Sequence, residues 1–287
     1  MAGTVIKRVG VLGSGIMGSG LAEVAAKAGC EVIVRSRSRA SADALLAGLG
    51  RNLDRQVAKG KLTADEQADV LGRVSGTDQL DALIECDLVI ESVVEDLAVK
   101  KALFAELEEV VQPEAIFASN TSTLPIVELA VQTQRPDRVC GLHFFNPAPV
   151  MRLVEIVRPL TASDQTVESV RAFALACQKE PVDVADRAGF VVNALLFPYL
   201  NNAVRLLEHG TASREDIDTA MQGGCNFPMG PLALLDLVGL DTSVSILDAH
   251  YEEYRDPNYA AVPLLRRMVT AGRLGRKSGQ GFYSYAS

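Results

Sequence analysis

The sequence predicts an α/β protein. We expect a doubly wound, mostly parallel sheet of Rossmann type with an inserted helical hairpin, followed by an all-helical C-terminal domain. Short apolar runs alternate with helical stretches over the first two thirds of the chain, which is typical of a parallel sheet wound with helices. A glycine-rich turn, GSGIMG, separates the first apolar run from a helical stretch. From Gly189 onward the pattern is almost entirely helical.

The elements follow in a simple order along the chain. Residues 4–12 predict the first strand, a helix after the turn closes near Gly29, and a second strand starts at Glu31. A polar helical region over 39–72 breaks near Gly60 and restarts at a capping-box sequence beginning at Thr63, which predicts the inserted hairpin. Further strands are predicted at 74–76, 87–92, 115–119, 138–143, 153–157 and 181–185. We therefore predict a dinucleotide-binding domain over residues 1–186 and a helical domain over 187–287, with the boundary near Arg187.

Composition excludes several classes of protein. The formal net charge of −8 argues against a nucleic-acid partner, because neutralising phosphates requires a basic surface. Polar residues or glycines interrupt every apolar run before it could span a membrane, and the sequence opens without a signal-peptide pattern. The five cysteines are scattered without zinc-type spacing, so we expect buried thiols, no metal site and a cytoplasmic location.

The glycine-rich turn predicts a dinucleotide cofactor. Gly13 permits the tight turn, Gly15 lets a pyrophosphate approach the backbone, and Gly18 lets the helix pack closely on the strand. Ile16 and Met17 begin the helix, whose free N–H groups and positive dipole end face the phosphates. An oxidoreductase that uses a nicotinamide cofactor follows from this arrangement.

Four polar residues are candidates for chemistry. Ligands of open α/β sheets bind at the carboxyl ends of the strands, where Ser122 and His143 are expected, while Glu155 lies inside a predicted strand and Asn193 in the first turns of a helix. Each residue also has a purely structural interpretation: Glu155 could pair with Arg152, and Asn193 could cap its helix. The other histidines, His209 and His250, lie in polar helical surroundings and are expected on solvated faces.

Long motifs carry a resemblance over almost the whole chain. The sequence resembles the L-3-hydroxyacyl-CoA dehydrogenase family, and within it the short-chain 3-hydroxybutyryl-CoA dehydrogenases. The motifs are GVLGSGIMGSG, ESVVEDLAVKKALF, SNTSTLPI, GLHFFNPAPVMRLVEIV, RAGFVVNALLFPYLNNA, FPMGPLALLDLVGLD and GRKSGQGFYSY. The resemblance implies that His143 is the catalytic histidine, Glu155 its carboxylate partner, Ser122 the serine of the Asn-Thr-Ser segment, and Asn193 a substrate-binding asparagine.

These roles agree with the chemistry of hydride transfer. Reduction of a 3-oxoacyl thioester leaves an alkoxide that needs a proton, and imidazole donates and accepts protons near neutral pH. A carboxylate beside the ring fixes its tautomer and stabilises the imidazolium. Ser122 and Asn193 would donate hydrogen bonds to the 3-oxygen and orient the carbonyl carbon.

The end of the second strand departs from the family's usual pattern. Where the family has Arg-Asp, this chain has Arg35-Ser36 in the run RSRSR, with Arg37 and Arg39 and no acid. An acid there would accept hydrogen bonds from the ribose hydroxyls of NAD, whereas Ser36 and Arg37 suit a 2′-phosphate. We therefore expect NADP as the cofactor, with NAD as the alternative. The basic run could also be a solvated surface segment without a ligand.

The resemblance extends to further ligand contacts. Glu95, Lys100, Asn120 and Asn146 match cofactor-side positions. Glu95 and Lys100 could equally form an exposed ion pair, and Asn146 a loop hydrogen bond. Coenzyme A, as part of the substrate, would reach the inserted hairpin, where Lys59 is a candidate contact or part of an ordinary solvated face.

The resemblance implies that the helical domain binds substrate and forms a homodimer. Its many apolar side chains could belong to the core or to a dimer face. The leucines in question are Leu195, Leu196, Leu206 and Leu207.

Three other functions compete with this one. A dehydrogenase of sugar acids such as L-gulonate could use the same scaffold. Enzymes that oxidise free 3-hydroxyacids use a lysine base, which nothing here matches. A non-enzymatic structural relative would be expected to lack one of the four polar residues, all of which are present. The length of the acyl chain is left open by the sequence.

Overall fold

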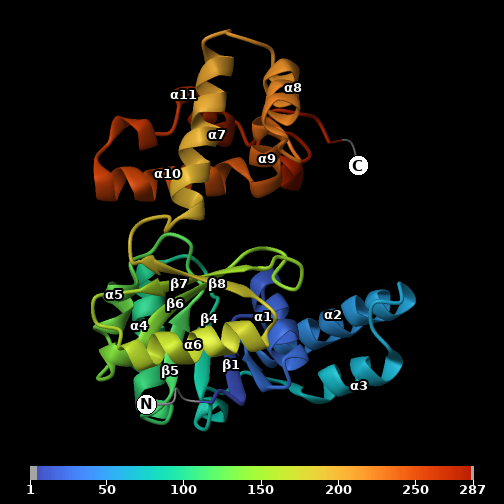
Figure 1. Ribbon diagram of the computed structural model, residues 1–287, viewed down its shortest axis with the longest axis vertical. Helices are drawn as coiled ribbons and strands as arrows, with labels where there is room; N and C mark the ends of the chain where they lie inside the picture. Colours follow the sequence, from blue (N-terminus) through green and yellow to red (C-terminus); the bar gives the residue numbers. More distant parts are fainter. Residues whose placement is uncertain (1–4, 286–287) are drawn as a thin grey trace. The chain divides into compact units, whose positions relative to one another are not determined.

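The computed structural model describes residues 5–285 of the chain. It divides into two compact units, Met1–Asp186 and Arg187–Ser287 (Figure 1). No helix within the described residues is long and apolar enough to cross a membrane.

The first unit is built on one eight-stranded sheet with the order β3-β2-β1-β4-β5-β6-β7-β8. The first six strands run parallel, β7 is antiparallel to β6, and β8 is parallel to β7. This confirms the doubly wound, mostly parallel sheet. The strands are β1 (Arg8–Leu12), β2 (Glu31–Arg35), β3 (Val74–Thr77), β4 (Leu88–Glu91), β5 (Ile116–Ser119), β6 (Val139–Phe144), β7 (Leu153–Arg158) and β8 (Glu180–Ala185).

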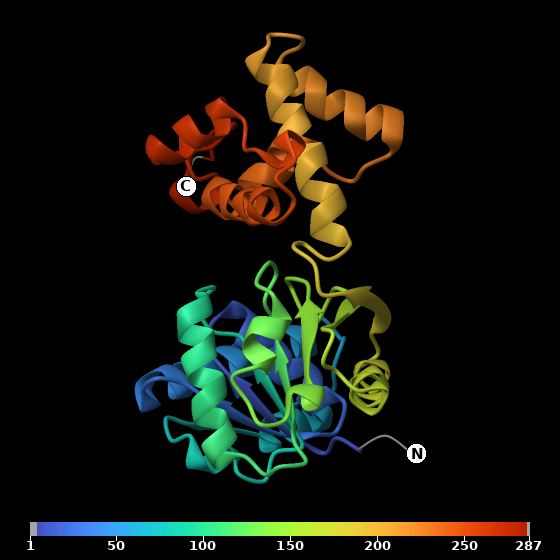
Figure 2. The ribbon, with the colours of Figure 1, turned by 90° about the vertical axis from the view of Figure 1, so that its left-hand side faces the viewer.

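Helices cover both faces of this sheet, and its central strands are mostly apolar and almost entirely buried. In Figure 2, α4 and α6 lie on opposite sides of the sheet. The core on the α6 side joins side chains from α1, α2 and α6 with those of six strands. The helices of this unit are α1 (Ile16–Lys27), α2 (Arg39–Ala58), α3 (Ala64–Gly72), α4 (Leu97–Val110), α5 (Ile126–Ala130) and α6 (Asp164–Ala176), with short 3-10 turns at Asp81–Leu83 and Pro136–Arg138.

Boundaries differ from the sequence prediction at a few ends. Strand β1 begins at Arg8, because the backbone N–H groups of Lys7 and Arg8 both donate to the Asp87 carboxylate rather than to a neighbouring strand. Thr4, where the predicted strand began, lies outside the described residues. The predicted hairpin is formed by α2 and α3, and Thr63 and Glu66 make both hydrogen bonds of the predicted capping box.

The second unit is helical and has its own apolar core. Its helices are α7 (Val192–Glu208), α8 (Arg214–Cys225), α9 (Pro231–Val238), α10 (Leu240–Tyr254) and α11 (Pro263–Thr270), with 3-10 turns at Pro257–Tyr259 and Arg276–Ser278. Among the leucines of α7, Leu196 and Leu207 pack against the core, whereas Leu195 and Leu206 are exposed. Two of the four leucines therefore belong to the core, and the other two lie uncovered on the surface of α7.

The cysteines are mostly buried, as expected. Cys30, Cys86, Cys140 and Cys177 are buried, but Cys225 is exposed at the end of α8, so the expectation was wrong for that residue. Burial raises the pKa of the thiols of Cys86, Cys140 and Cys177 to about 12. These three cysteines are therefore protonated apolar side chains at neutral pH.

The expectation for His250 was wrong, because its side chain is fully buried, whereas His209 is exposed as expected. His250 Nδ1 lies 2.6 Å from the carbonyl oxygen of Ile246, to which it must donate. The ring stacks on Tyr259, with centroids 5.1 Å apart. Aromatic neighbours provided by the fold thus cover a residue whose local sequence is polar.

We expect His250 to make folding stability depend on pH. Burial lowers the pKa of His250 below its ordinary value of 6.5, so the unfolded chain binds the proton more readily than the folded one. The stability that the buried neutral ring contributes is fully present above pH ~6.5 and is lost as the pH falls. The free energy of unfolding then decreases by at most about 1.4 kcal/mol per pH unit. The free energy of unfolding, measured from pH 5 to 7.5, should vary less in His250→Phe than in the wild type. Equal pH dependence in both proteins would contradict this.

Candidate active site

A histidine and a glutamate face each other across two antiparallel strands. In the register of β6 and β7, His143 lies directly opposite Glu155, and residues so paired carry their side chains on the same face of the sheet. His143 Nδ1 and Glu155 Oε2 are 2.7 Å apart, and both side chains are buried. Since a carboxylate only accepts, Nδ1 carries the proton of this hydrogen bond and Nε2 is left for other partners. Arg152, the alternative partner of Glu155, pairs with Glu180 instead.

Ser122 extends this pair into a chain of three side chains. It lies in the loop after β5 (Ile116–Ser119), next to β6 in the sheet, and its Oγ is 3.0 Å from His143 Nε2. The sheet therefore brings Ser122, His143 and Glu155 together at the carboxyl ends of β5 and β6, with Phe145 beside the imidazole ring at 4.5 Å between centroids. This arrangement can move a proton at Nε2 while Glu155 holds the ring.

An ion-pair network around the buried Lys100 supports the Ser122 loop. Glu95 accepts hydrogen bonds from the hydroxyl of Thr121 and from the backbone N–H of Ser122. Lys100, fully buried, makes ion pairs with Glu95 at 2.8 Å and with Glu91 at 2.9 Å. Burial alone would raise the pKa of Glu95, but Lys100 and these hydrogen bonds hold it below its ordinary value. Glu95 and Lys100 do form the ion pair that the sequence allowed, and Glu95 is exposed, but Lys100 is buried and also pairs with Glu91.

Glu91 completes the network and was not recognised from the sequence. Its carboxylate also accepts from Ser119 Oγ at 2.6 Å and from the backbone N–H of Val93 at 2.6 Å, and its side chain is fully buried. A glutamate ending an apolar strand four residues before a second glutamate was the available signal. The network fixes the ends of β4 and β5, from which the Ser122 loop departs.

We expect Lys100→Met to destabilise the protein by about 3 kcal/mol, because it leaves the buried carboxylate of Glu91 without its ammonium partner. Lys101→Met is the matched control: its partner Glu128 is exposed, and such pairs contribute less than about 1 kcal/mol. Urea unfolding of both variants measures the difference. Equal midpoints would show that the network around Lys100 does not stabilise the fold.

The glycine-rich turn forms one wall of a cavity of about 720 Å³. An added Cβ at Gly13, whose φ is +111°, would lie 2.3 Å from the carbonyl oxygen of Ser92, and one at Gly18 would lie 2.0 Å from that of Gly13. These two glycines are required by packing. A Cβ at Gly15 would meet nothing within 4 Å, so the protein leaves that space open. An open space at the N-terminus of α1 fits a pyrophosphate group.

The end of β2 also lines this cavity, beside the glycine-rich turn, together with residues of α4. Ser36 is buried and its Oγ lies 2.7 Å from Ser14 Oγ, a contact that sequence reasoning did not foresee. Within residues 5–285 neither Arg35 nor Arg37 makes an ion pair, and the buried Nε of Arg35 lacks a hydrogen-bond partner. Arg39, by contrast, pairs with Asp43 and does not line the cavity.

The remaining predicted site residues are distributed over both units. Asn120 Oδ1 accepts from the backbone N–H of Phe144 at 2.9 Å and so links the ends of β5 and β6. Asn146 precedes a cis proline and lines a groove between α1 and α2 together with Gly15 and Ile16. Lys59 is exposed at the C-terminus of α2.

Two further predicted residues lie on α1 and α7. Met17 packs partly against the core, close to the glycine-rich turn. Asn193 lies in the first turn of α7, in the second unit.

Comparison with known proteins agrees with this architecture. The family model for the NAD binding domain of 3-hydroxyacyl-CoA dehydrogenase matches residues 8–187, and that for the C-terminal domain matches residues 189–285. The 3-hydroxybutyryl-CoA dehydrogenase of Mycobacterium tuberculosis (strain ATCC 25618 / H37Rv) is 51% identical over 282 residues, covering 98% of this chain and 99% of that protein. The 3-hydroxybutyryl-CoA dehydrogenase of Clostridioides difficile is 45% identical, covering 97% and 99%.

Solved structures share the complete fold. The (S)-3-hydroxybutyryl-CoA dehydrogenase PaaH1 from Ralstonia eutropha has a TM-score of 0.96 at 42% identity, covering 98% of this chain and 100% of that one. Fold and matches together define an oxidoreductase with an NAD-binding domain of Rossmann type. More narrowly, the chain belongs to the 3-hydroxyacyl-CoA dehydrogenase family.

Proposed function

We propose that this protein transfers hydride between NADP(H) and C3 of short-chain 3-oxoacyl-CoA and (S)-3-hydroxyacyl-CoA, with acetoacetyl-CoA and 3-hydroxybutyryl-CoA as the substrate pair. The continuous Ser122–His143–Glu155 hydrogen-bond chain carries the proposal, because it offers the kind of proton-transfer group that the family's reaction requires. The preference for a four-carbon chain is supported by relatives that are named 3-hydroxybutyryl-CoA dehydrogenases.

Each side chain of the site has a different role in the proposed reaction. A bound nicotinamide supplies the hydride in reduction and accepts it in oxidation. In reduction, His143 gives the Nε2 proton to the oxygen at C3 as it becomes an alkoxide, and in oxidation the neutral ring takes that proton back. Glu155 holds Nδ1–H and stabilises the imidazolium. Ser122 positions the oxygen by a hydrogen bond, and we assign the same role to Asn193.

The choice of NADP rests on the wall beside Ser36. Two guanidinium groups without ion-pair partners within residues 5–285, Arg35 and Arg37, line the cavity where a 2′-phosphate would lie, and one acid, Glu106, lies on the α4 side. Guanidinium groups bind phosphate through two parallel hydrogen bonds. Gly15, Ile16 and the start of α1 would hold the pyrophosphate, and Asn120 and Asn146 the nicotinamide side. NAD is the alternative cofactor.

A rate panel tests the proposal. We expect the highest kcat/KM with the C4 substrate in a series of C4 to C16 3-oxoacyl-CoAs, and a higher value with NADPH than with NADH for each. Equal use of both cofactors would refute the NADP preference without affecting the reaction class. Turnover of L-gulonate in place of acetoacetyl-CoA would refute the acyl-CoA assignment.

We also propose a cytoplasmic homodimer formed through the helical unit. Leu195 and Leu206, about three turns apart and therefore near one face of α7, are exposed apolar side chains that a second copy would cover. Leu206→Asp should shift the mass measured by light scattering from dimer toward monomer, with Glu208→Gln as an exposed control on the same helix. A wild-type protein that is monomeric at micromolar concentration would overturn this.

A further inference from the structure

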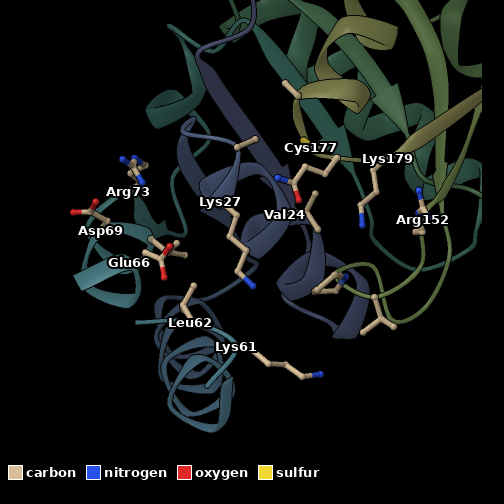
Figure 3. Close-up of a pocket in the computed structure, with 16 residues that line it drawn as sticks. Val24, Lys27, Lys61, Leu62, Glu66, Asp69, Arg73, Arg152, Cys177 and Lys179 are labelled. Carbon is tan, nitrogen blue, oxygen red and sulfur yellow. The ribbon is translucent and has the colours of Figure 1, made fainter. Parts of the chain in front are cut away.

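A second large cavity lies apart from the glycine-rich turn. It has a volume of about 730 Å³. It is formed by the last turn of α1, the connection between α2 and α3, α3 itself, the loop before β7, and the end of α6 with the loop that leads to β8 (Figure 3). Its lining residues on α1 are Val24, Lys27 and Ala28, which lie about 12–18 Å along the helix from the glycine-rich turn. Its volume is within the usual range for small-molecule sites.

Basic residues predominate among the charged side chains that line this cavity. Five basic side chains and two acidic ones, Glu66 and Asp69, line it. Figure 3 shows Lys27 and Lys179 extending into the space from different elements, with Lys61 at its edge. The five basic residues are Lys27, Lys61, Arg73, Arg152 and Lys179.

Most of this charge is already paired or exposed, but Lys179 is different. Lys27 pairs with Glu23 and Arg152 with Glu180. Lys179 is 7% exposed, and its Nζ donates to the carbonyl oxygens of Ala148 at 2.6 Å and Met151 at 2.9 Å. No carboxylate of residues 5–285 forms an ion pair with it.

Lys100 is the second buried lysine to compare with Lys179. Lys100 is also buried and has two carboxylate partners, Glu91 and Glu95. Burying a charge without a counter-charge is costly. Burial lowers the pKa of Lys179, as expected for an ammonium without a counter-ion. One donor position of Lys179 remains unused, since an ammonium has three.

We propose that this cavity binds a small phosphate-bearing anion, distinct from the cofactor and from the acyl-CoA substrate, whose negative charge is received by the ammonium of Lys179. Lys61 and Arg73, which make no ion pair within the described residues, would contact the same anion from the hairpin side. The bound anion would therefore supply the negative charge that Lys179 lacks in the protein itself.

Binding there would reach the candidate active site through one loop. The carbonyl groups that Lys179 holds belong to the segment between β6 and β7, the strands that carry His143 and Glu155. The same segment packs on α1, because an added Cβ at Gly20 would lie 3.1 Å from Ala148 Cβ. An anion on Lys179 would thus stabilise residues 145–152 in their present conformation.

Calorimetric titration with inorganic pyrophosphate tests the proposal. The protein is first saturated with oxidised dinucleotide cofactor, so that the glycine-rich turn is filled. We expect binding that is about tenfold weaker in Lys179→Met, as for loss of a charge-assisted hydrogen bond, and unchanged in the exposed control Lys7→Gln. Pyrophosphate should also slow amide hydrogen exchange in residues 145–152.

The double variant Lys61→Gln/Arg73→Gln keeps the Lys179 contacts intact, so weaker binding in that variant supports the site even if Lys179→Met fails to fold. Three results would overturn the proposal: no binding to the wild type at millimolar pyrophosphate, equal affinity in the wild type and the double variant, or complete displacement by free coenzyme A. The last result would assign the cavity to the substrate. None of these results depends on catalytic activity.

Discussion

Replacing His143 by alanine is expected to reduce kcat for acetoacetyl-CoA by about 10³-fold, within the range that positioned acid–base groups contribute. The variant keeps Ser122 and Glu155 but has no group at the position of Nε2 that could donate a proton to the oxygen at C3. Cofactor binding should be nearly unchanged, because His143 does not line the cavity between the glycine-rich turn and the end of β2. Steady-state kinetics and a fluorescence titration with NADPH measure the two quantities separately.

Glu155→Gln provides a graded comparison for this prediction. An amide oxygen can still accept from Nδ1–H, but it removes the negative charge that stabilises the imidazolium, so kcat should fall less than in His143→Ala. Exposed His209 offers a control, His209→Ala, without an expected effect on turnover. If His143→Ala retained near wild-type kcat, His143 would not be the proton donor.

The fold was predictable because local signals and tertiary structure agree. Apolar strands alternate with helices, Gly13 and Gly18 stand where any Cβ would collide with backbone, and Thr63 begins a capping box that the structure contains. His250 shows the limit of such signals. Its neighbours in sequence are polar, but Tyr259, beyond the end of its helix, stacks on it and encloses it. Burial of that kind depends on tertiary contacts.

The central residues of the candidate site were predictable from the sequence, but the contacts that hold the surrounding segments in place were not. The motif around His143 and Glu155 is continuous in sequence, and their opposition follows from the register of two adjacent strands. Glu91, in contrast, acts through partners on β5 and α4 that the sequence does not place beside it. Ser14 and Lys179 were missed for the same reason, because their contacts join segments far apart in the chain.

Two variants beside the cofactor cavity should reverse the proposed preference for NADP. Ser36→Asp introduces a carboxylate where the 2′-phosphate would lie, and like charges in contact cost several kcal/mol, so KM for NADPH should rise about 100-fold or more. KM for NADH should fall or stay constant, because the new carboxylate can accept hydrogen bonds from the ribose hydroxyls.

Arg37→Ala tests the same site without touching the core. Ser36 is buried against Ser14, so Ser36→Asp could also disturb the turn, whereas Arg37 is exposed and its removal costs only the charge-assisted hydrogen bonds to a phosphate. We expect a loss of about tenfold in kcat/KM with NADPH and none with NADH. Arg39→Ala, in the same basic run but paired with Asp43 outside the cavity, should leave both values unchanged. Parallel losses with both cofactors in Arg37→Ala would mean that its guanidinium does not distinguish the 2′-phosphate, and that the missing acid after β2 does not select NADP.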